Sequence, residues 1–473
     1  MSASSKKSFY ITTTLPYVNA EPHIGFATEI LRADVLNRWK KIGGHDVFFN
    51  TGTDEHGLKI YQKAQEEDID IRDFVNKYSD KFKGLIELLG IDKNVHFIRT
   101  TDEKHIKAAQ EFWKRCQKDI EKKIYKTKYC IGCELEKTDS ELENGQCVLH
   151  PNLEIEEREE ENYFFKFSNY QEKLLDLYKS RPDFVIPDFR FNEIKSFVEK
   201  GLEDFSISRL KEKMPWGVPV PGDPKHIMYV WFDALVSYIS TLGWPSDDEN
   251  FNKFWVNGTP TQYAGKDNLR QQSAMWQAML MSAEIPNSHQ IIINGFINSS
   301  GQKMSKSLGN VISPSELVEK YGTEATRYLL LRHVHPWEDT GITWEKLDEW
   351  YNAHLANGLG NLVSRIMTLA AANLEKPAEI PEWENMEEYF ALLEKYDFNA
   401  AMDYIWNKIG TLDLLIQDKK PWESKDKKVI SDLAIRLYSI ARMINPLMPE
   451  TSAKIKALVK ANKKPENLFP RLN

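Results

Sequence analysis

The spacing of apolar residues divides the chain into two regions. In the first, short runs of β-branched and aromatic residues, such as residues 9–14, alternate with stretches in which apolar residues recur every three or four positions, such as residues 24–39. Strands that alternate with helices are typical of a parallel α/β sheet. From about residue 345 onward the spacing is helical, and prolines interrupt it at Pro377, Pro421 and Pro446. This second region is therefore predicted to be a bundle of antiparallel helices.

A change of character near residue 124 indicates an inserted segment. The segment up to about residue 221 contains three of the four cysteines and the acidic stretch 154–161, and the alternation of strand and helix patterns resumes after it. We interpret this segment as an insertion into the α/β domain. The predicted division is residues 1–123 and 222–295 for the two halves of the α/β domain, 124–221 for the insertion, 296–345 for a linker and 346–473 for the helical bundle.

The overall composition is that of a water-soluble protein with several domains. The chain has 473 residues, of which 41% are hydrophobic and 28% are charged. No apolar run approaches the roughly 20 residues that a membrane span needs, and the N-terminus does not resemble a secretory signal. We therefore expect a cytoplasmic protein that does not bind membranes. We also expect it to be a monomer. The net charge of −8 argues mildly against nucleic-acid binding, but a local basic surface can still bind phosphates.

Three clustered cysteines and a histidine predict a metal site. Their spacing is Cys130-x2-Cys133-x13-Cys147-x2-His150. Three thiolates and an imidazole suit one tetrahedral zinc ion, and a site with all four positions filled by protein is structural. Free thiols are the alternative, although clustered cysteines in a cytoplasmic chain more often bind metal. Cys116 lies outside this spacing and is interpreted as an ordinary helix residue.

Two motifs at opposite ends of the α/β region can bind a polyphosphate. Pro22-His23-Ile24-Gly25-Phe26 follows a predicted strand and loop and begins a helix, whose N-terminus offers N–H groups to phosphates. Gly25 permits the close approach of a nucleotide. Taken alone, the motif favours a helix-start histidine without a ligand, and the second motif reverses that balance. Lys303-Met304-Ser305-Lys306-Ser307 lies between two glycines and carries two ammonium groups that can follow a migrating charge.

With these two motifs, five motifs in order resemble the methionyl-tRNA synthetases, a family of class I aminoacyl-tRNA synthetases. Leu15-Pro16-Tyr17 precedes the motif that contains His23. The other three motifs lie at residues 53–57, 229–234 and 265–267. The resemblance implies a Rossmann-like nucleotide-binding catalytic domain split by an insertion with a single zinc knuckle, followed by an α-helical anticodon-binding bundle. It also implies ATP-dependent activation of L-methionine to methionyl-adenylate, with Mg²⁺ accompanying ATP. Transfer to the 3′ end of tRNA(Met), including the initiator tRNA, would follow.

The family motifs assign roles to individual positions of this chain. Residues that match catalytic positions are His23, Lys303 and Lys306, and these also match ATP-binding positions together with Gly25, Phe26, Asp267 and Ser305. Residues that match the methionine pocket are Leu15, Tyr17, Asp54, Trp231, Ala234, Tyr238 and Gln272. Aromatic surroundings suit a polarizable thioether, and Asp54 would receive the substrate ammonium. Asn361 and Arg365 match anticodon-binding positions, and their spacing of four places them on one helix face.

Several positions depart from the commoner family pattern. Phe26 stands where a second histidine is usual, Gln272 stands where better-known members carry a pocket histidine, and Asn268 replaces an aliphatic residue. No tryptophan follows Trp422, so the aromatic residue that stacks on the anticodon in many members is not placed. Two rival functions are a small-molecule nucleotidyltransferase of the same superfamily and a catalytically inactive tRNA-binding relative. The first would lack the helical bundle, and the second would not need His23, Asp54 and the lysine motif.

Overall fold

A parallel sheet forms the centre of the N-terminal region in the computed structural model, which describes residues 7–130, 135–137, 142–147, 154–299, 302–303, 312–382 and 385–472. Within these residues the strand order is β3-β2-β1-β13-β14-β9, and every pairing is parallel. The strands are β1 (Ser8–Thr13), β2 (Asp46–Thr53), β3 (His96–Arg99), β9 (Val185–Ile186), β13 (Thr259–Gly265) and β14 (Gln290–Asn294). The predicted α/β layer is thereby confirmed.

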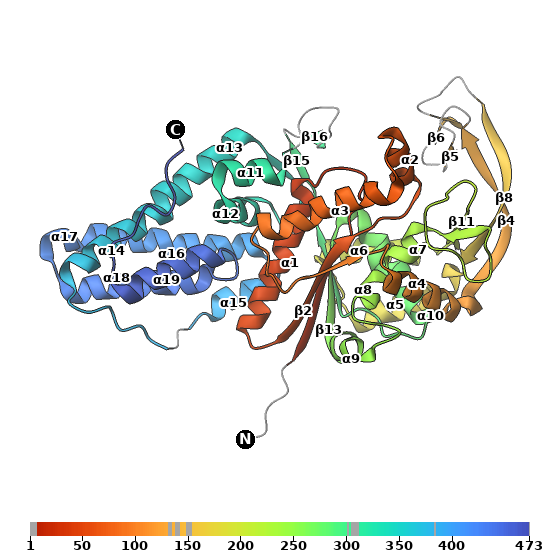
Figure 1. Ribbon diagram of the computed structural model, residues 1–473. Helices are drawn as coiled ribbons and strands as arrows, with labels where there is room; N and C mark the ends of the chain where they lie inside the picture. The colour runs from red at the N-terminus through yellow and green to blue at the C-terminus, as the bar shows by residue number, and fades with distance from the viewer. Residues whose placement is uncertain are drawn as a thin grey trace.

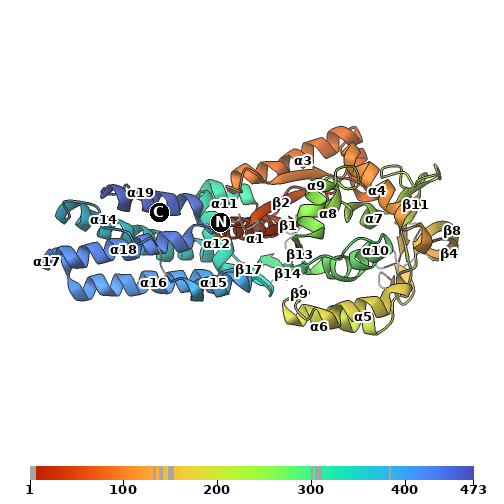
Figure 2. The same ribbon diagram turned by 90° about the horizontal axis from the view of Figure 1, so that it is seen from below.

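Helices cover both faces of this sheet (Figures 1 and 2). Neighbouring strand residues point to opposite sides, so that Phe9 and Ile11 belong to one hydrophobic cluster while Tyr10 belongs to the other. Helices α1 (Ile24–Ile42) and α3 (Ile71–Leu88) contribute to the first cluster, and α4 (Glu103–Arg115) and α10 (Trp276–Ser282) to the second. The remaining helices of this region are α2 (Leu58–Glu66), α7 (Val230–Ala234), α8 (Ser237–Ser240) and α9 (Asp248–Asn250).

The first part of the inserted segment is built on a long antiparallel strand pair. Strand β4 (Ile120–Cys130) pairs with β8 (Ile155–Phe165) over their whole lengths, from Ile120 opposite Phe165 to Cys130 opposite Ile155. This strand pair lies at the end of the molecule opposite the helical bundle (Figure 1). The short strands β5 (Leu135–Lys137), β6 (Leu142–Glu143), β7 (Gln146–Cys147), β10 (Phe205–Ser206), β11 (Ser208–Leu210) and β12 (His226–Met228) complete this part. Helices α5 (Gln171–Ser180) and α6 (Asp188–Glu199) flank β9, which joins the central sheet at its edge.

The C-terminal region is helical, as its apolar spacing predicts. Its elements are α13 (Trp344–Trp350), the π-helical stretch η8 (Tyr351–Gly360), α14 (Asn361–Asn373), α15 (Glu387–Glu394), α16 (Phe398–Lys419), α17 (Pro421–Ser424), α18 (Lys427–Ile444) and α19 (Pro449–Ala461). Pro421 begins a short helix, and Pro446 lies in the turn between α18 and α19. No helix in the described ranges is both long and apolar enough to cross a membrane.

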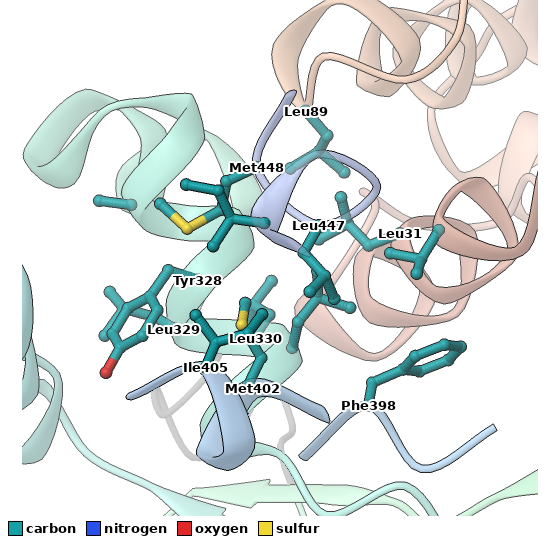
Figure 3. Packing of buried hydrophobic residues seen from close by; sticks show 14 of the residues in the cluster. Leu31, Leu89, Tyr328, Leu329, Leu330, Phe398, Met402, Ile405, Leu447 and Met448 are labelled. Carbon is teal, nitrogen blue, oxygen red and sulfur yellow. The ribbon is translucent and has the colours of Figure 1, made fainter. Parts of the chain in front are cut away.

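A linker segment ties the bundle to the sheet domain. It contains β15 (Ile297–Ser299), β16 (Gln302–Lys303), α11 (Pro314–Tyr321), α12 (Thr323–His333) and β17 (Thr340–Ile342). Side chains of α12, such as Leu329 and Leu330, pack between Leu31 of α1 and Met402 of α16 (Figure 3). Asp34 and Arg327 form a fully buried ion pair at 2.8 Å in the same layer. The sheet domain and the bundle therefore share one continuous core.

Candidate active site

A cavity of about 560 Å³ opens at the carboxyl ends of the central strands. Its walls come from the loop after β1, the first turns of α1, the end of β2, helices α7 and α8, and the loops after β13 and β14. Strand β1 lies between β2 and β13 in the sheet. The chain continues from β1 to β2 on one side, whereas β13 on the other side comes much later in the sequence. Ligands of open α/β sheets bind at such a switch point.

The residues predicted to form the methionine pocket meet in this cavity. All of them line its wall, namely Leu15, Tyr17, Asp54, Trp231, Ala234, Tyr238 and Gln272. The backbone of Asp54 donates to the carbonyl of Pro16 at 2.9 Å, which fixes the carboxylate beside the loop after β1. The rings of Tyr17 and Trp231 meet edge to face, with centroids 6.5 Å apart. One end of the cavity thus combines aromatic walls with the buried carboxylate of Asp54.

Asp54 lies in a buried cluster of titratable side chains. Burial raises its pKa well above the usual range, and the neighbouring Asp233 carboxylate adds to this effect. Burial also acts to raise the pKa of Asp233, but His56 and His105 outweigh it and hold that pKa below its usual value. The ring nitrogens of His56 and His105 lie 2.9 and 3.0 Å from the Asp233 carboxylate. A cationic group beside Asp54 would favour the ionised form of its carboxylate.

The start of α1 forms the other end of the cavity. His23 is the N-cap of this helix, and its Nδ1 accepts a hydrogen bond from the Gly25 N–H at 3.1 Å. The ring proton is therefore on Nε2, the tautomer that can donate to a phosphoryl oxygen. A Cβ atom on Gly25 would lie 2.8 Å from His23 Cε1, so glycine is needed for this arrangement. Gly25, Phe26 and Asp267, which match ATP-binding positions of the family, also line the cavity.

Glu29 and Asn294 are wall residues that sequence reasoning missed. Glu29 accepts hydrogen bonds from the Thr14 N–H at 2.8 Å and from the Asn294 side chain at 3.3 Å. Burial raises the pKa of Glu29 to about 8, against the opposing hydrogen bonds from Thr14. Arg32, one turn further along α1, donates to Asn294 at 3.2 Å and to the Val334 carbonyl at 2.8 Å. A glutamate on the buried stripe of α1 was the available sequence signal.

The lysine motif falls mainly outside the described residues. Ser305 and Lys306 are not described, and Lys303 is described only as part of β16. Its backbone pairs with Asn298 of β15, the residue after the cavity-lining Ile297. The motif therefore starts one strand away from the cavity wall.

Two of the four predicted zinc ligands, Cys130 and Cys147, lie in short antiparallel strand pairs. Cys133 and His150 fall outside the described residues, so the complete site is not described. Cys130 ends β4 and pairs with Leu135 of β5, while Cys147 pairs with Leu142 and is 1% exposed. Among the described residues alone, no group of three metal-binding side chains forms. The cysteines that end strands β4 and β7 suit the donor set of a zinc knuckle.

Cys116 is not part of this cluster. It ends α4, is fully buried, and its thiol lies 3.6 Å from the Met279 carbonyl. Burial raises the pKa of this thiol to about 12. Its surroundings are those of an inert core residue, in agreement with the sequence interpretation.

The two predicted anticodon residues lie on one face of α14. Asn361 is exposed at its start, while Leu362 and Val363 are buried, as the predicted helix face requires. Arg365 is partly exposed and forms an ion pair with Asp413 of α16. Trp422 on α17, directly after α16, is 46% exposed. The exposed indole of Trp422, just after the end of α16, offers a stacking surface that the sequence analysis did not assign.

Comparison with known proteins identifies the family. The family model described as "tRNA synthetases class I (M)" matches residues 9–148 and 132–367. A methionine–tRNA ligase of Thermotoga maritima is 40% identical, with the match covering 97% of this chain and 76% of the relative. One from Brucella suis is 36% identical, covering 95% and 91%.

Solved structures give the same result. The Mycobacterium tuberculosis methionyl-tRNA synthetase in complex with methionyl-adenylate superposes with a TM-score of 0.86 at 35% identity, over 95% of this chain and 93% of that one. Its apo form matches with a TM-score of 0.81 at 30% identity, over the full length of both chains. The resemblance inferred from the motifs is confirmed, and this chain belongs to the methionyl-tRNA synthetase family of class I aminoacyl-tRNA synthetases.

Proposed function

We propose that this chain activates L-methionine with ATP and transfers the methionyl group to the 3′-terminal adenosine of tRNA(Met), including the initiator tRNA. One observation carries the proposal: a single cavity joins an aromatic pocket with a buried carboxylate to the N-terminus of α1. Methionyl-adenylate has a cationic, thioether-bearing end and a phosphate end, and these two ends of the cavity complement them. The likeness to a synthetase solved with methionyl-adenylate supports the same substrate.

We propose that the amino-acid end of the cavity recognises methionine by the charge of its ammonium group and by its polarizable thioether. Asp54 would pair with the ammonium group, which would favour its ionised form despite the desolvation that burial imposes. Tyr17, Trp231 and Tyr238 would surround the thioether with aromatic rings. Leu15 and Ala234 would add apolar contacts, and Gln272 would form the polar floor behind Tyr238.

The phosphate end is proposed to position ATP for in-line attack. The methionine carboxylate attacks the α-phosphorus, and pyrophosphate leaves with the electron pair of the broken P–O bond. His23 Nε2 and the N-terminus of α1 would stabilise the phosphoryl oxygens, and Gly25, Phe26 and Asp267 would contact the nucleotide. Lys303, Ser305 and Lys306 would hold the leaving pyrophosphate. Mg²⁺ bound with ATP would neutralise phosphate charge.

The second step needs the anticodon-binding region. The terminal ribose hydroxyl of tRNA attacks the methionyl carbonyl of the adenylate, and AMP leaves, so no covalent enzyme intermediate is required. Asn361 and Arg365 would contact anticodon bases, and Trp422 would supply a stacking surface. We also propose that the protein is a cytoplasmic monomer with one structural zinc held by Cys130, Cys133, Cys147 and His150.

The five predicted segments are retained as a proposal for the domain division. Residues 1–123 and 222–295 would form the catalytic domain and 296–345 the linker. Residues 346–473 would form the anticodon-binding domain. The insertion, residues 124–221, would not be purely peripheral, because β9 within it pairs with β14 of the central sheet.

Methionine-dependent exchange of pyrophosphate into ATP, followed by tRNA charging, tests the function. Asp54→Asn should reduce exchange strongly, and Asp70→Asn, an exposed helix cap in the same domain, is a matched control. Exchange that depends on another small molecule would favour the nucleotidyltransferase alternative. Binding of tRNA(Met) without exchange would favour the inactive relative, and either result would overturn the proposal.

A further inference from the structure

A row of buried polar side chains leads from the core to the wall of the amino-acid pocket. We propose that this row, Gln277–Ser288–Gln262–Gln272, fixes the direction in which the Tyr238 hydroxyl donates its proton, and that Gln262 and Ser288 are positioning residues for selection of the methionine side chain. The proposal rests on the function proposed above. Neither Gln262 nor Ser288 lines the cavity, so both would act through other residues.

The first link is fixed by two backbone groups. The oxygen of the Gln277 side chain accepts the Ser288 N–H at 3.1 Å, and its nitrogen donates to the Gln272 carbonyl at 2.8 Å. A backbone N–H only donates and a carbonyl only accepts. The two ends of the Gln277 amide are therefore not interchangeable.

The same direction passes through each following link. The Gln277 nitrogen also donates to Ser288 Oγ at 3.1 Å, and the Ser288 hydroxyl donates to the oxygen of Gln262. The Gln262 nitrogen donates to the oxygen of Gln272 at 2.6 Å. The Gln272 nitrogen donates to the Tyr238 hydroxyl oxygen at 2.6 Å. Each amide accepts on one side and donates on the other, so a flip of any one would oppose like groups.

Because the row is buried, its hydrogen bonds cannot be reversed without a cost in free energy. The residues of the row are at most 2% exposed and Tyr238 is 3% exposed, and a buried polar group that loses its partner is costly. Tyr238 is itself anchored, because the Tyr10 hydroxyl donates to its carbonyl at 2.8 Å. Burial also raises the pKa of Tyr238, which keeps its hydroxyl protonated.

The phenolic proton is consequently directed into the cavity. The Tyr238 oxygen already accepts from Gln272, and none of the described residues accepts its proton. A thioether sulfur is a weak acceptor, whereas the methylene group that replaces it in norleucine is not. The row would therefore favour methionine over its near-isosteric analogue norleucine.

The test compares methionine with norleucine in variants of residues outside the cavity. Binding constants from calorimetry and kcat/KM from pyrophosphate exchange are measured for both amino acids. Gln262→Met and Ser288→Ala should each lower the methionine-to-norleucine ratio about fivefold, the effect of one hydrogen bond. Ser288→Thr, which keeps the hydroxyl, should restore the ratio. Ser273→Ala is a matched control, because that buried hydroxyl has no partner in the described part of the chain.

The outcomes separate this inference from the proposed function. A ratio within twofold of wild type in both Gln262→Met and Ser288→Ala overturns the inference, as does an equal loss in Ser288→Thr or Ser273→Ala. Methionine binding without exchange in the wild-type protein overturns the proposed function alone, since the binding ratio still tests the row. Absence of methionine binding overturns both.

Discussion

The ring of Phe26 packs edge-on against the ring of Phe82, with centroids 5.5 Å apart and planes 80° to each other. Phe26 is on α1 and Phe82 on α3, and both line the cavity. Family members more often carry a histidine at the position of Phe26. In this chain the position joins two helices through an aromatic contact, which is a packing role.

Replacement of Phe26 separates packing from catalysis. Phe26→His should keep methionine-dependent pyrophosphate exchange within about tenfold, because an imidazole ring can still lie against Phe82. Phe26→Ala should lower stability by about 3 kcal/mol, as expected for a lost core phenyl ring. Exchange rates and thermal unfolding of both variants are measured together. Near-total loss of exchange in a folded Phe26→His protein would mean that nucleotide binding requires the phenyl ring.

Glu29 should make stability depend on pH. Burial raises its folded-state pKa to about 8 from an ordinary value of 4.5, so the folded protein binds more protons between these values. Relative to Glu29→Gln, the unfolding free energy of the wild-type protein is highest below about pH 4.5. It declines by up to about 1.4 kcal/mol per pH unit as pH rises toward 8. Melting temperatures of both proteins across this range test the sign. A difference that grows with pH in favour of wild type would contradict it, and Glu172→Gln controls for the charge change.

Lys306 should act mainly in the transition state. Charge develops on the leaving pyrophosphate, so Lys306→Ala should slow adenylate formation by roughly two to three decades, the effect of one lost electrostatic donor. ATP affinity should change far less. Rapid-quench measurement of adenylate formation gives both quantities, with the exposed Lys346→Ala as a control. Loss of ATP affinity at an unchanged rate would refute this role.

Zinc should hold together the short strand pairs of the insertion that contain Cys130 and Cys147. Metal analysis should find about one zinc per chain, and Cys133→Ser should release it. Exchange activity should largely remain, while limited proteolysis within residues 130–153 should become faster. Cys116→Ala should keep its zinc, because that thiol is buried between α4 and the Met279 carbonyl. A zinc-free protein after purification without chelators would remove the basis for this site.

The sequence analysis named most residues that line the pocket but missed the residues that hold them in place. Tyr17, Asp54 and Trp231 belong to compact motifs, and the resemblance of these motifs to the family grouped them in one pocket. The pairing of Asp233 with His56 and His105 joins residues 177 and 128 positions apart, and periodicity carries no signal for such contacts. Glu29 was missed because the pattern of a buried helix face is defined by apolar residues. Its hydrogen-bond donors, Thr14 and Asn294, are distant from it in the sequence. Strand β9 was missed because two residues are too short for a pattern.

The last prediction concerns Arg365 and its partner Asp413. Arg365→Ala should weaken tRNA(Met) aminoacylation by about 1–3 kcal/mol in kcat/KM, the size of a lost base contact. Pyrophosphate exchange, which needs no tRNA, should be unchanged. Both rates are measured on the same preparations, with Arg436→Ala, an exposed arginine of α18 paired with Asp432, as the control.

Asp413→Asn distinguishes base contact from structural support. Arg365 and Asp413 are about one-third exposed, so their ion pair contributes little to stability by itself. If the guanidinium binds tRNA, weakening its tie to Asp413 leaves the positive charge available, and aminoacylation should be retained or improved. If the ion pair only holds α14 to α16, Arg365→Ala and Asp413→Asn should lower the melting temperature and tRNA charging alike. Equal losses in the two variants, or equal damage to exchange and charging in Arg365→Ala, would show that Arg365 does not recognise RNA.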